Sequence, residues 1–159
     1  MMTDNTEYRG EYLIELLDAD TGQVLARHNL KNQLTEISRT IRTQMLTGTY
    51  TGDKKALEIK YFAFGSSSTP ASVNDTQLGA ETYRKQITQL SQPSAGVVRS
   101  VVSLGSAEAN GSIKEIGVFC GPTATGSANT GTLLSRVIVD ISKNSNMIVN
   151  VIRTDTCTI

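Results

Sequence analysis

The sequence contains no tryptophan, two cysteines and one histidine among its 159 residues. The two cysteines and the histidine are too few, and wrongly spaced, for a structural zinc site. Lysine and arginine together number 15, as do aspartate and glutamate, so the chain lacks the net positive charge that attracts nucleic acid. No apolar run approaches the roughly 20 residues of a membrane span, and the polar start lacks the apolar centre of a signal peptide. We therefore expect a soluble protein made in a cytoplasm, with no metal, cofactor, nucleic acid or membrane as partner.

The apolar residues that are present are mostly aliphatic, because aromatic residues make up 5% of the chain. A core built from valine, isoleucine and leucine favours strands. A chain of this length buries roughly 68–70% of its unfolded surface around a single core. We expect one domain over residues 10–159, preceded by a polar N-terminal arm over residues 1–9.

Short apolar segments separated by polar and glycine-rich joints predict a series of strands. We expect strands at residues 11–17, 23–29, 57–64, 82–89, 97–104, 113–119, 132–141 and 147–159. With hairpin joints and a single helix, this pattern indicates a mainly β fold, an antiparallel β-sandwich or barrel of about seven strands with one amphipathic helix. Because the final strand runs almost to the last residue, we expect it at a sheet edge or against a partner.

The helix is expected over about residues 33–47, where apolar side chains recur at helical spacing. This stripe consists of Leu34, Ile37, Ile41 and Met45. Asn32 or Thr35 can accept hydrogen bonds from the free amides at its start, and Gly48 can end it in a left-handed conformation. We expect the stripe to pack against one face of a sheet.

The segment ANGSIKEIGVFCG contains Asn110-Gly111, the strongest short signal for a hairpin. A strand should therefore begin near Ser112. The period of two then places one set of side chains on one face and the alternate set on the other. The two sets are Ile113, Glu115, Gly117 and Phe119, and Lys114, Ile116, Val118 and Cys120.

Cysteine chemistry has little support in the sequence. His28 is the single histidine that could serve as a base, and neither Cys120 nor Cys157 begins a helix or follows a basic neighbour. We expect both cysteines to be small buried apolar groups. The alternative is a covalent role, either a disulfide between the two or a bridge between subunits, formed after release from a reducing cytoplasm.

Other catalytic arrangements are not supported either. Glu81, Glu108, Glu115 and Asp140 are numerous enough for glycoside hydrolysis, but that reaction needs two carboxylates facing each other across a cleft. The loops GSSSTP and GPTATG lack the lysine and the helix start of a phosphate cradle, and no GxSxG turn is present. We expect no catalytic residue and no enzymatic activity.

Four short motifs follow one another in the chain. They are IKYFAFG, ending at Gly65; DTQLGAETYRK, with Asp75, Leu78, Glu81 and Arg84; NGSIKEIGVF, with Gly111, Glu115, Gly117 and Phe119; and GTLLSR, ending at Arg136. In this order and spacing, and with the helical segment LKNQLTEISRTIRTQML before them, the chain resembles a family of small structural proteins of tailed-bacteriophage virions. The resemblance covers roughly residues 29–141.

This resemblance implies a non-enzymatic virion subunit, assembled in the bacterial host cytoplasm. Its partners would be identical subunits, as a trimer or hexamer, and other virion proteins. A tail, neck, baseplate or fibre-base position is expected first, and a capsid decoration (cement) protein is the alternative. A second alternative is a carbohydrate-binding receptor module in which tyrosines such as Tyr50, Tyr61 and Tyr83 stack on sugars.

The charged residues of the motifs lie in or beside apolar strands. A charge is tolerated there only if it is paired or faces water. We predict that at least one arginine–glutamate pair among Glu81, Arg84, Glu115 and Arg136 is partly buried and fixes the register between strands or subunits. The alternative is an ordinary solvated face.

Overall fold

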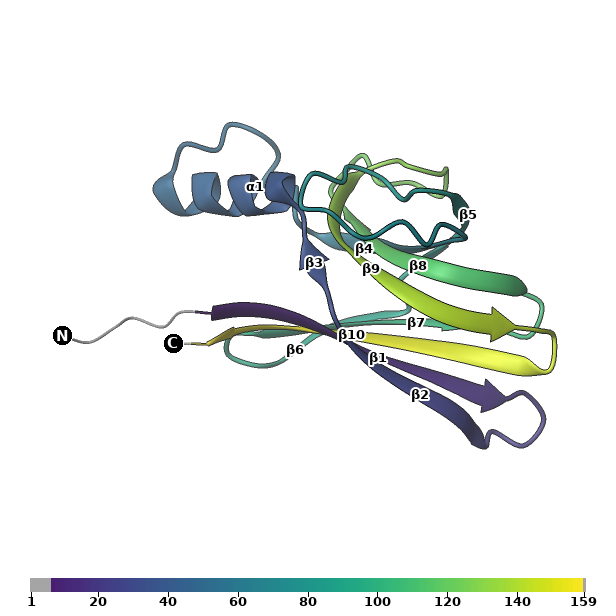
Figure 1. The fold of residues 1–159 in the computed structure, drawn as a ribbon. Coiled ribbons are helices and arrows are strands. Elements are labelled where there is room, and N and C mark those ends of the chain that lie inside the picture. The colour runs from purple at the N-terminus through teal and green to yellow at the C-terminus, as the bar shows by residue number, and fades with distance from the viewer. Residues whose placement is uncertain (1–6, 159) are drawn as a thin grey trace.

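A computed structural model describes residues 7–158 as two antiparallel sheets of five strands each, with one helix (Figure 1). The first sheet contains, in spatial order, β2 (Val24–Lys31), β1 (Glu7–Asp18), β10 (Met147–Thr158), β7 (Val97–Leu104) and β6 (Gln89–Ser94). The second contains β3 (Gln33–Leu34), β9 (Thr132–Lys143), β8 (Gly111–Cys120), β4 (Ile59–Gly65) and β5 (Glu81–Gln86). The helix α1 (Glu36–Thr47) follows β3. The predicted sandwich with one helix is confirmed, and the sheets do not close into a barrel.

The main core lies between the facing surfaces of the two sheets. Aliphatic side chains dominate it, and Tyr12 meets Phe62 edge to face with ring centroids 6.4 Å apart. The first sheet contributes Ile14, Val102, Leu104, Val149 and Val151, and the second contributes Phe64, Ile116, Val118, Leu134 and Ile141. Strands supply these side chains alternately, since successive residues point to opposite faces of a sheet.

The chain crosses from the first sheet to the second immediately after β2. At the crossing, the Asn32 amide donates to the Gly10 carbonyl over 3.1 Å. A Cβ atom at Gly10 would lie 2.3 Å from the Asn32 side chain, so the close approach requires glycine. The crossing places α1 beside the second sheet and leaves residues 7–10 of β1 extending beyond β2.

The predicted C-terminal end of the helix is confirmed, but the helix begins later than expected, because Gln33 and Leu34 form β3 and Asn32 is not the cap. Thr35 is the N-cap, since its hydroxyl accepts from the Ser38 amide over 3.3 Å, and Gly48 ends the helix with φ of 70°. The apolar stripe is not buried on a sheet as predicted: Ile37 is 43% exposed, Ile41 and Met45 are half-buried, and Ser38 is the buried helix residue. The Thr35 hydroxyl holds the start of α1 to the carbonyl of Leu133 in β9, and the rest of the helix projects past the sheets (Figure 1).

The hairpin predicted at Asn110-Gly111 is wrong. β7 lies in the first sheet and β8 in the second, so the segment between them is a crossover. The positive φ values fall at Ala109 (49°) and Gly111 (124°) instead of at the two residues of the Asn-Gly pair. A dipeptide signal reports local backbone preference and carries no information about which sheet the next strand joins.

The predicted alternation along β8 holds except at its start. Ile113 lies in the core with Ile116 and Val118, although it was expected on the face of Glu115. The register against β9 shifts between Ile113 and Glu115, which is a β-bulge, and Lys114 points outward to pair with Asp140. One extra residue at a bulge reverses the faces on one side of it.

Three further expectations are corrected. β10 is central in the first sheet, between β1 and β7, and is not an edge strand. The strand expected at 82–89 is divided between β5 and β6, which belong to different sheets. Residues 7–9 of the expected arm are part of β1, while residues 1–6 and Ile159 lie outside the described residues.

Candidate functional site

Two loops cover the outer face of the second sheet, the face turned away from the main core. They span residues 66–80, between β4 and β5, and 121–131, between β8 and β9. Leu78 of the first loop and Ala124 of the second form a small apolar cluster with Phe119, Ala63 and Leu133 of the sheet. Gly117 makes room for Leu78, since a Cβ there would lie 2.7 Å from a methyl group of that leucine.

Glu115 is the centre of a charged cluster under the first loop. Its side chain is completely buried, so its charge needs partners. Oε1 accepts from the amides of Ala80 at 2.7 Å and Ser67 at 3.4 Å, and Oε2 accepts from the Gly79 amide at 3.0 Å. Gly65 is needed at the end of β4, because a Cβ there would lie 2.4 Å from Oε1. The carboxylate therefore fixes both ends of loop 66–80.

Arg136 of β9 is the counter-charge. Its Nε donates to Glu115 Oε2 over 2.7 Å, and its Nη1 donates to Asp75 Oδ2 over 2.8 Å. The remaining donors reach the carbonyls of Thr69 at 2.9 Å and Pro70 at 3.3 Å. Burial by itself lowers the pKa of Arg136, but the hydrogen bonds and charges of the two carboxylates outweigh it and raise that pKa above its ordinary value. The guanidinium thus stays charged and holds the middle of the loop.

A second buried pair secures the loop at 121–131. Arg84 and Glu81 of β5 form two hydrogen bonds, of 2.7 and 3.0 Å, with side chains 2% and 3% exposed. Arg84 Nη1 donates to the Thr130 carbonyl over 2.8 Å, and the Asn129 amide donates to Glu81 Oε2 over 2.9 Å. The guanidinium also lies 4.1 Å from the centre of the Phe119 ring, a cation–π contact.

The structure brings together all the motif residues except Gly111, which starts β8 without a contact to the cluster. The prediction of a buried arginine–glutamate pair is confirmed twice, and the alternative of a solvated face is wrong. Sequence reasoning missed the backbone amides and carbonyls that complete the cluster. Every residue has a backbone carbonyl and every residue except proline a backbone amide N–H, so no residue pattern could have indicated them. We call this arrangement the loop-locking cluster. It consists of loops 66–80 and 121–131 and of the residues that hold them: Gly65, Asp75, Glu81, Arg84, Glu115, Gly117 and Arg136.

The two cysteines differ in burial. Cys120 faces the core, where burial raises the pKa of its thiol to about 12. Cys157 is exposed, so its expected burial is wrong. It lies near the end of β10, beyond the core residue Val151. Both thiols are free and the two are not bridged to each other. A bridge between subunits stays a prediction for Cys157.

The residues considered for catalysis do not form a reacting centre with one another. His28 of β2 lies opposite Ile14 of β1 in the first sheet, whereas Cys120 lies in β8 of the second sheet. Cys157 is six residues along β10 from the partner of Ile14, roughly 20 Å away. Glu108 receives hydrogen bonds from Lys85, the Gly105 amide and the Tyr83 hydroxyl, and Asp140 pairs with Lys114.

Two absences hold for residues 7–158. No group of three or more histidine, cysteine, aspartate or glutamate side chains is placed to hold a metal ion. None of the described residues forms a helix with the length and apolar character needed to cross a membrane.

The tyrosines proposed for sugar stacking lie apart. Tyr61 packs on the outer face of the second sheet below Arg84, with 5.8 Å between the guanidinium and the ring centre. Tyr83 packs beside Phe64 at the main core, with a ring-centre separation of 6.5 Å. Tyr50 lies in the segment after α1. The three do not form a single platform.

Comparisons with protein-family models, with curated proteins and with solved structures found no match.

Proposed function

We propose that this chain is a structural subunit of a tailed-phage virion that acts by symmetric assembly with copies of itself. The observation that carries the proposal is the loop-locking cluster. The motif residues that give the chain its resemblance to virion proteins meet in this cluster, except Gly111, and their hydrogen bonds hold two loops on a sheet. Their role there is to fix a shape.

A fixed loop surface suits a subunit that is repeated by symmetry. Loops of this length are costly to order, because each residue fixed loses roughly 1–2 kcal/mol of backbone entropy. Buried charges at both ends and in the middle of loop 66–80 offset that cost. An assembly of identical subunits requires the same outline in every copy, and a locked loop meets this requirement.

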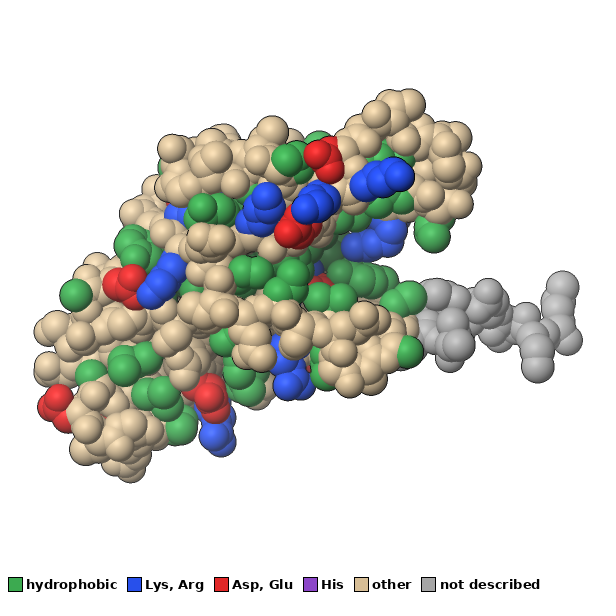
Figure 2. Space-filling view, turned by 180° about the vertical axis from the view of Figure 1, so that it is seen from behind, with side chains coloured by type: hydrophobic (Ala, Val, Ile, Leu, Met, Phe, Trp, Pro, Cys, Tyr) green, Lys and Arg blue, Asp and Glu red, His purple; other side chains and the backbone are tan. Residues whose placement is uncertain are grey.

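Exposed apolar side chains supply the second line of support. Burial against a neighbour stabilises an assembly by roughly 25 cal/mol per Å² of apolar area. Hydrophobic side chains follow the hollow between α1 and the first sheet (Figure 2). Among the residues that the structure describes, the exposed large hydrophobic side chains are Val24, Leu25, Ile37, Leu46, Val73, Leu90 and Val98.

A tail, neck, baseplate or fibre-base position is the first proposal, and capsid decoration is the second. In both positions the subunit would use the same loop surface, and the number of copies in each particle distinguishes the two. Decoration of a shell needs on the order of hundreds of copies, while a ring in a tail needs tens or fewer.

The test is quantitative mass spectrometry of purified particles, combined with gold-labelled antibodies in electron microscopy. We expect the chain in the particles at tens of copies or fewer, with gold on the tail or its junction with the head. Hundreds of copies and gold over the shell would favour decoration. Particles without the chain would contradict both positions.

A further inference from the structure

Outside the loop-locking cluster, the outer face of the first sheet combines an apolar centre with unpaired charges. Alternate residues of β1, β10 and β7 lie on this face, since successive side chains point to opposite faces of a sheet. Leu13 of β1 lies opposite Ile152 of β10, which lies opposite Val101 of β7. All three side chains are half-buried, although no helix or loop within residues 7–158 lies over this face (Figure 1). They form an apolar row across the three central strands.

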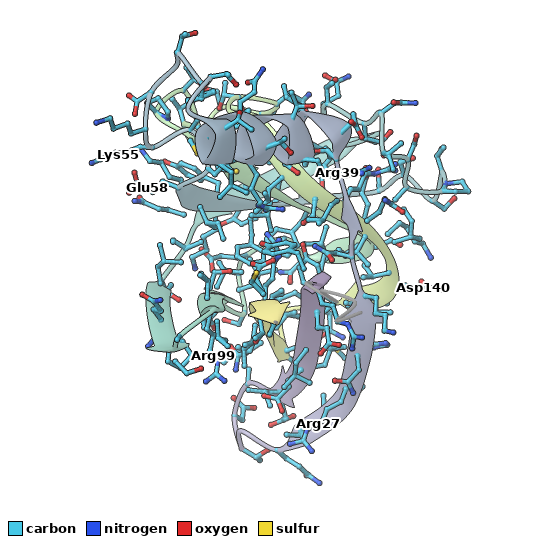
Figure 3. The ribbon with its side chains drawn as sticks, turned by 90° about the vertical axis from the view of Figure 1, so that its left-hand side faces the viewer. Arg27, Arg39, Lys55, Glu58, Arg99 and Asp140 are labelled. Atoms are coloured by element: carbon cyan, nitrogen blue, oxygen red, sulfur yellow. The ribbon has the colours of Figure 1, made fainter. Side chains whose placement is uncertain are left out.

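Two charged side chains beside the apolar row have no ion-pair partner. Glu11 of β1 and Arg99 of β7 lie on either side of Thr154 in β10, two residues along the strands from the row. Both are exposed, and neither forms an ion pair with another residue that the structure describes. On the other side of the row, Glu15 is already paired with Arg27 over 2.8 Å. In Figure 3, Arg99 and Arg27 lie on the side of the first sheet turned away from α1.

The order of the strands determines how a second copy can bring the two charges together. β10 is the central strand, with β1 on one side and β7 on the other. A two-fold axis along β10 therefore stacks β1 of one copy on β7 of the other. In that arrangement Glu11 faces Arg99 twice, and Ile152 faces its own counterpart. The apolar row is covered as well, since Leu13 then faces Val101.

The charges disfavour the other face-to-face arrangement. A two-fold axis perpendicular to the strands at the apolar row would stack β1 on β1, so that Glu11 faces Glu15. It would also set Lys31 against Arg27 on β2. Like charges that meet across an interface suppress that arrangement. With the axis along β10, Lys31 instead faces Ser91 of β6 and meets no like charge there.

The face is large enough for a stable contact. It has five strands, of which β2 and β7 have 8 residues each. The usual rise and strand spacing give it dimensions of about 24 by 26 Å, or an area of about 600 Å². Two copies would bury about 1,200 Å² together, which reaches the roughly 1,200–2,000 Å² of specific interfaces. A flat face of this kind suits a second sheet, since sheets pack face to face with their strands within about 30° of each other.

We propose that two copies of this chain pack their first sheets face to face, with the two-fold axis along β10 and two Glu11–Arg99 ion pairs between the copies. The inference rests on the proposed function, because it specifies one contact between identical subunits. The contact is isologous, so each copy takes part in it once and the copies are joined in pairs. A hexamer of three such pairs contains the contact, whereas a trimer does not.

Charge reversal tests the contact through its two ion pairs. Glu11→Arg and Arg99→Glu each set like charges against each other, so the dissociation constant of the pair should rise at least about tenfold. Sedimentation velocity should then show half the mass of the wild-type assembly. An equimolar mixture of the two variants should recover the full mass, because each ion pair then contains one arginine and one glutamate. Lys55→Glu is the matched control, since Lys55 is exposed at the level of α1, away from the first sheet (Figure 3).

Cross-linking at the two-fold axis provides an independent readout. Thr154 of β10 lies on the outer face, so it would face its own counterpart across the axis. With the exposed thiol removed by Cys157→Ser, a short bismaleimide should convert Thr154→Cys into covalent dimers and nothing larger. Gln23→Cys in the same background is the control and should stay single, since Gln23 is exposed in the turn between β1 and β2.

The outcomes separate the contact from the proposed function. A wild type that forms a trimer, reversal variants that assemble like the wild type, or a Thr154→Cys variant without covalent dimers would overturn the contact and leave the structural role standing. A wild type that stays monomeric at every concentration would overturn the contact and homomeric assembly together. Circular dichroism establishes that the variants are folded, and the cross-link decides the question if a reversal variant is not.

Discussion

At the scale of single residues, buried charge explains why the motifs contain both signs. Glu115 has no exposed surface, yet three amides and one guanidinium donate to it. A carboxylate without these donors would be strongly disfavoured in that position. Arg136 and Glu115 lie on neighbouring strands, and Asp75 comes from a loop, so the pairing specifies strand register and loop position together.

Replacing Arg136 by methionine should therefore be costly. The change keeps an unbranched apolar stem and removes the counter-charge of a buried carboxylate, which is expected to cost about 3–5 kcal/mol of unfolding free energy. Arg27→Met is the control, since Arg27 also pairs with a glutamate but its side chain is 60% exposed, and it should cost under about 1 kcal/mol. Urea denaturation of both variants measures the difference, and equal losses would contradict the role given to Arg136.

Glu108 should make stability depend on pH in the acid range. Hydrogen bonds from Lys85, the Gly105 amide and Tyr83 lower the pKa of Glu108 from 4.5 to about 2. Its contribution is therefore complete above pH 4.5 and is lost as the pH falls toward 2. Between pH 5 and pH 2 the wild type should lose roughly 1–2 kcal/mol more than Glu108→Gln, allowing for the partial exposure of the carboxyl. Parallel stability curves for the two proteins would count against this assignment.

The two thiols should react at very different rates. Cys157 is exposed, whereas Cys120 is buried and its thiol has a pKa of about 12. Because the thiolate is the reactive form, native protein should take up one maleimide label and unfolded protein two. Mass spectrometry of the labelled chain measures this, and rapid labelling of Cys120 in folded protein would mean that the core opens readily.

At the scale of elements, the sequence predicted where the strands and the helix lie better than it predicted which strands are neighbours in a sheet. The period of two located residues 97–104 as a strand with the bounds that the structure shows. It did not place β7 and β8 in different sheets, because periodicity reports which face is apolar and says nothing about which strand pairs with which. The bulge at Ile113 was missed for the same local reason, since one inserted residue has no sequence signature of its own.

For the candidate site, too, the sequence predicted one part, and the other part was visible only in the structure. Charged residues in apolar strands predicted a buried pair, and Glu115 with Arg136 is such a pair. The backbone groups of Thr69, Gly79 and Ala80 that complete the site became visible only in three dimensions. For α1, the spacing of apolar residues predicted the helix but not its position, because the sharp crossing at Asn32 carries it past the sheets.

Loop 66–80 should loosen when the space under Leu78 is filled. A methyl group at Gly117 would lie 2.7 Å from Leu78 and 3.0 Å from Leu133, so Gly117→Ala should cost about 1–3 kcal/mol. Hydrogen exchange should accelerate at the amides of Gly79 and Ala80, which donate to Glu115. Gly126→Ala is the control, since nothing lies within 4 Å of a Cβ there. Unchanged exchange in Gly117→Ala would contradict the coupling between the leucine and the loop.

At the scale of the whole molecule, the two sheets differ in what covers their outer faces. Locked loops cover the second sheet, while the first sheet presents half-buried apolar residues on its outer face, among them Leu13 and Ile152, which are paired in register. An apolar sheet face left uncovered in this way suits assembly with a neighbouring copy.

The molar mass of the purified wild-type chain, measured by light scattering over a wide concentration range, tests the central claim most directly. A subunit that acts by assembly should show a discrete trimer or hexamer of the 17.1 kDa chain, which dissociates only on dilution. A folded chain that keeps the mass of one copy at every concentration would contradict the account.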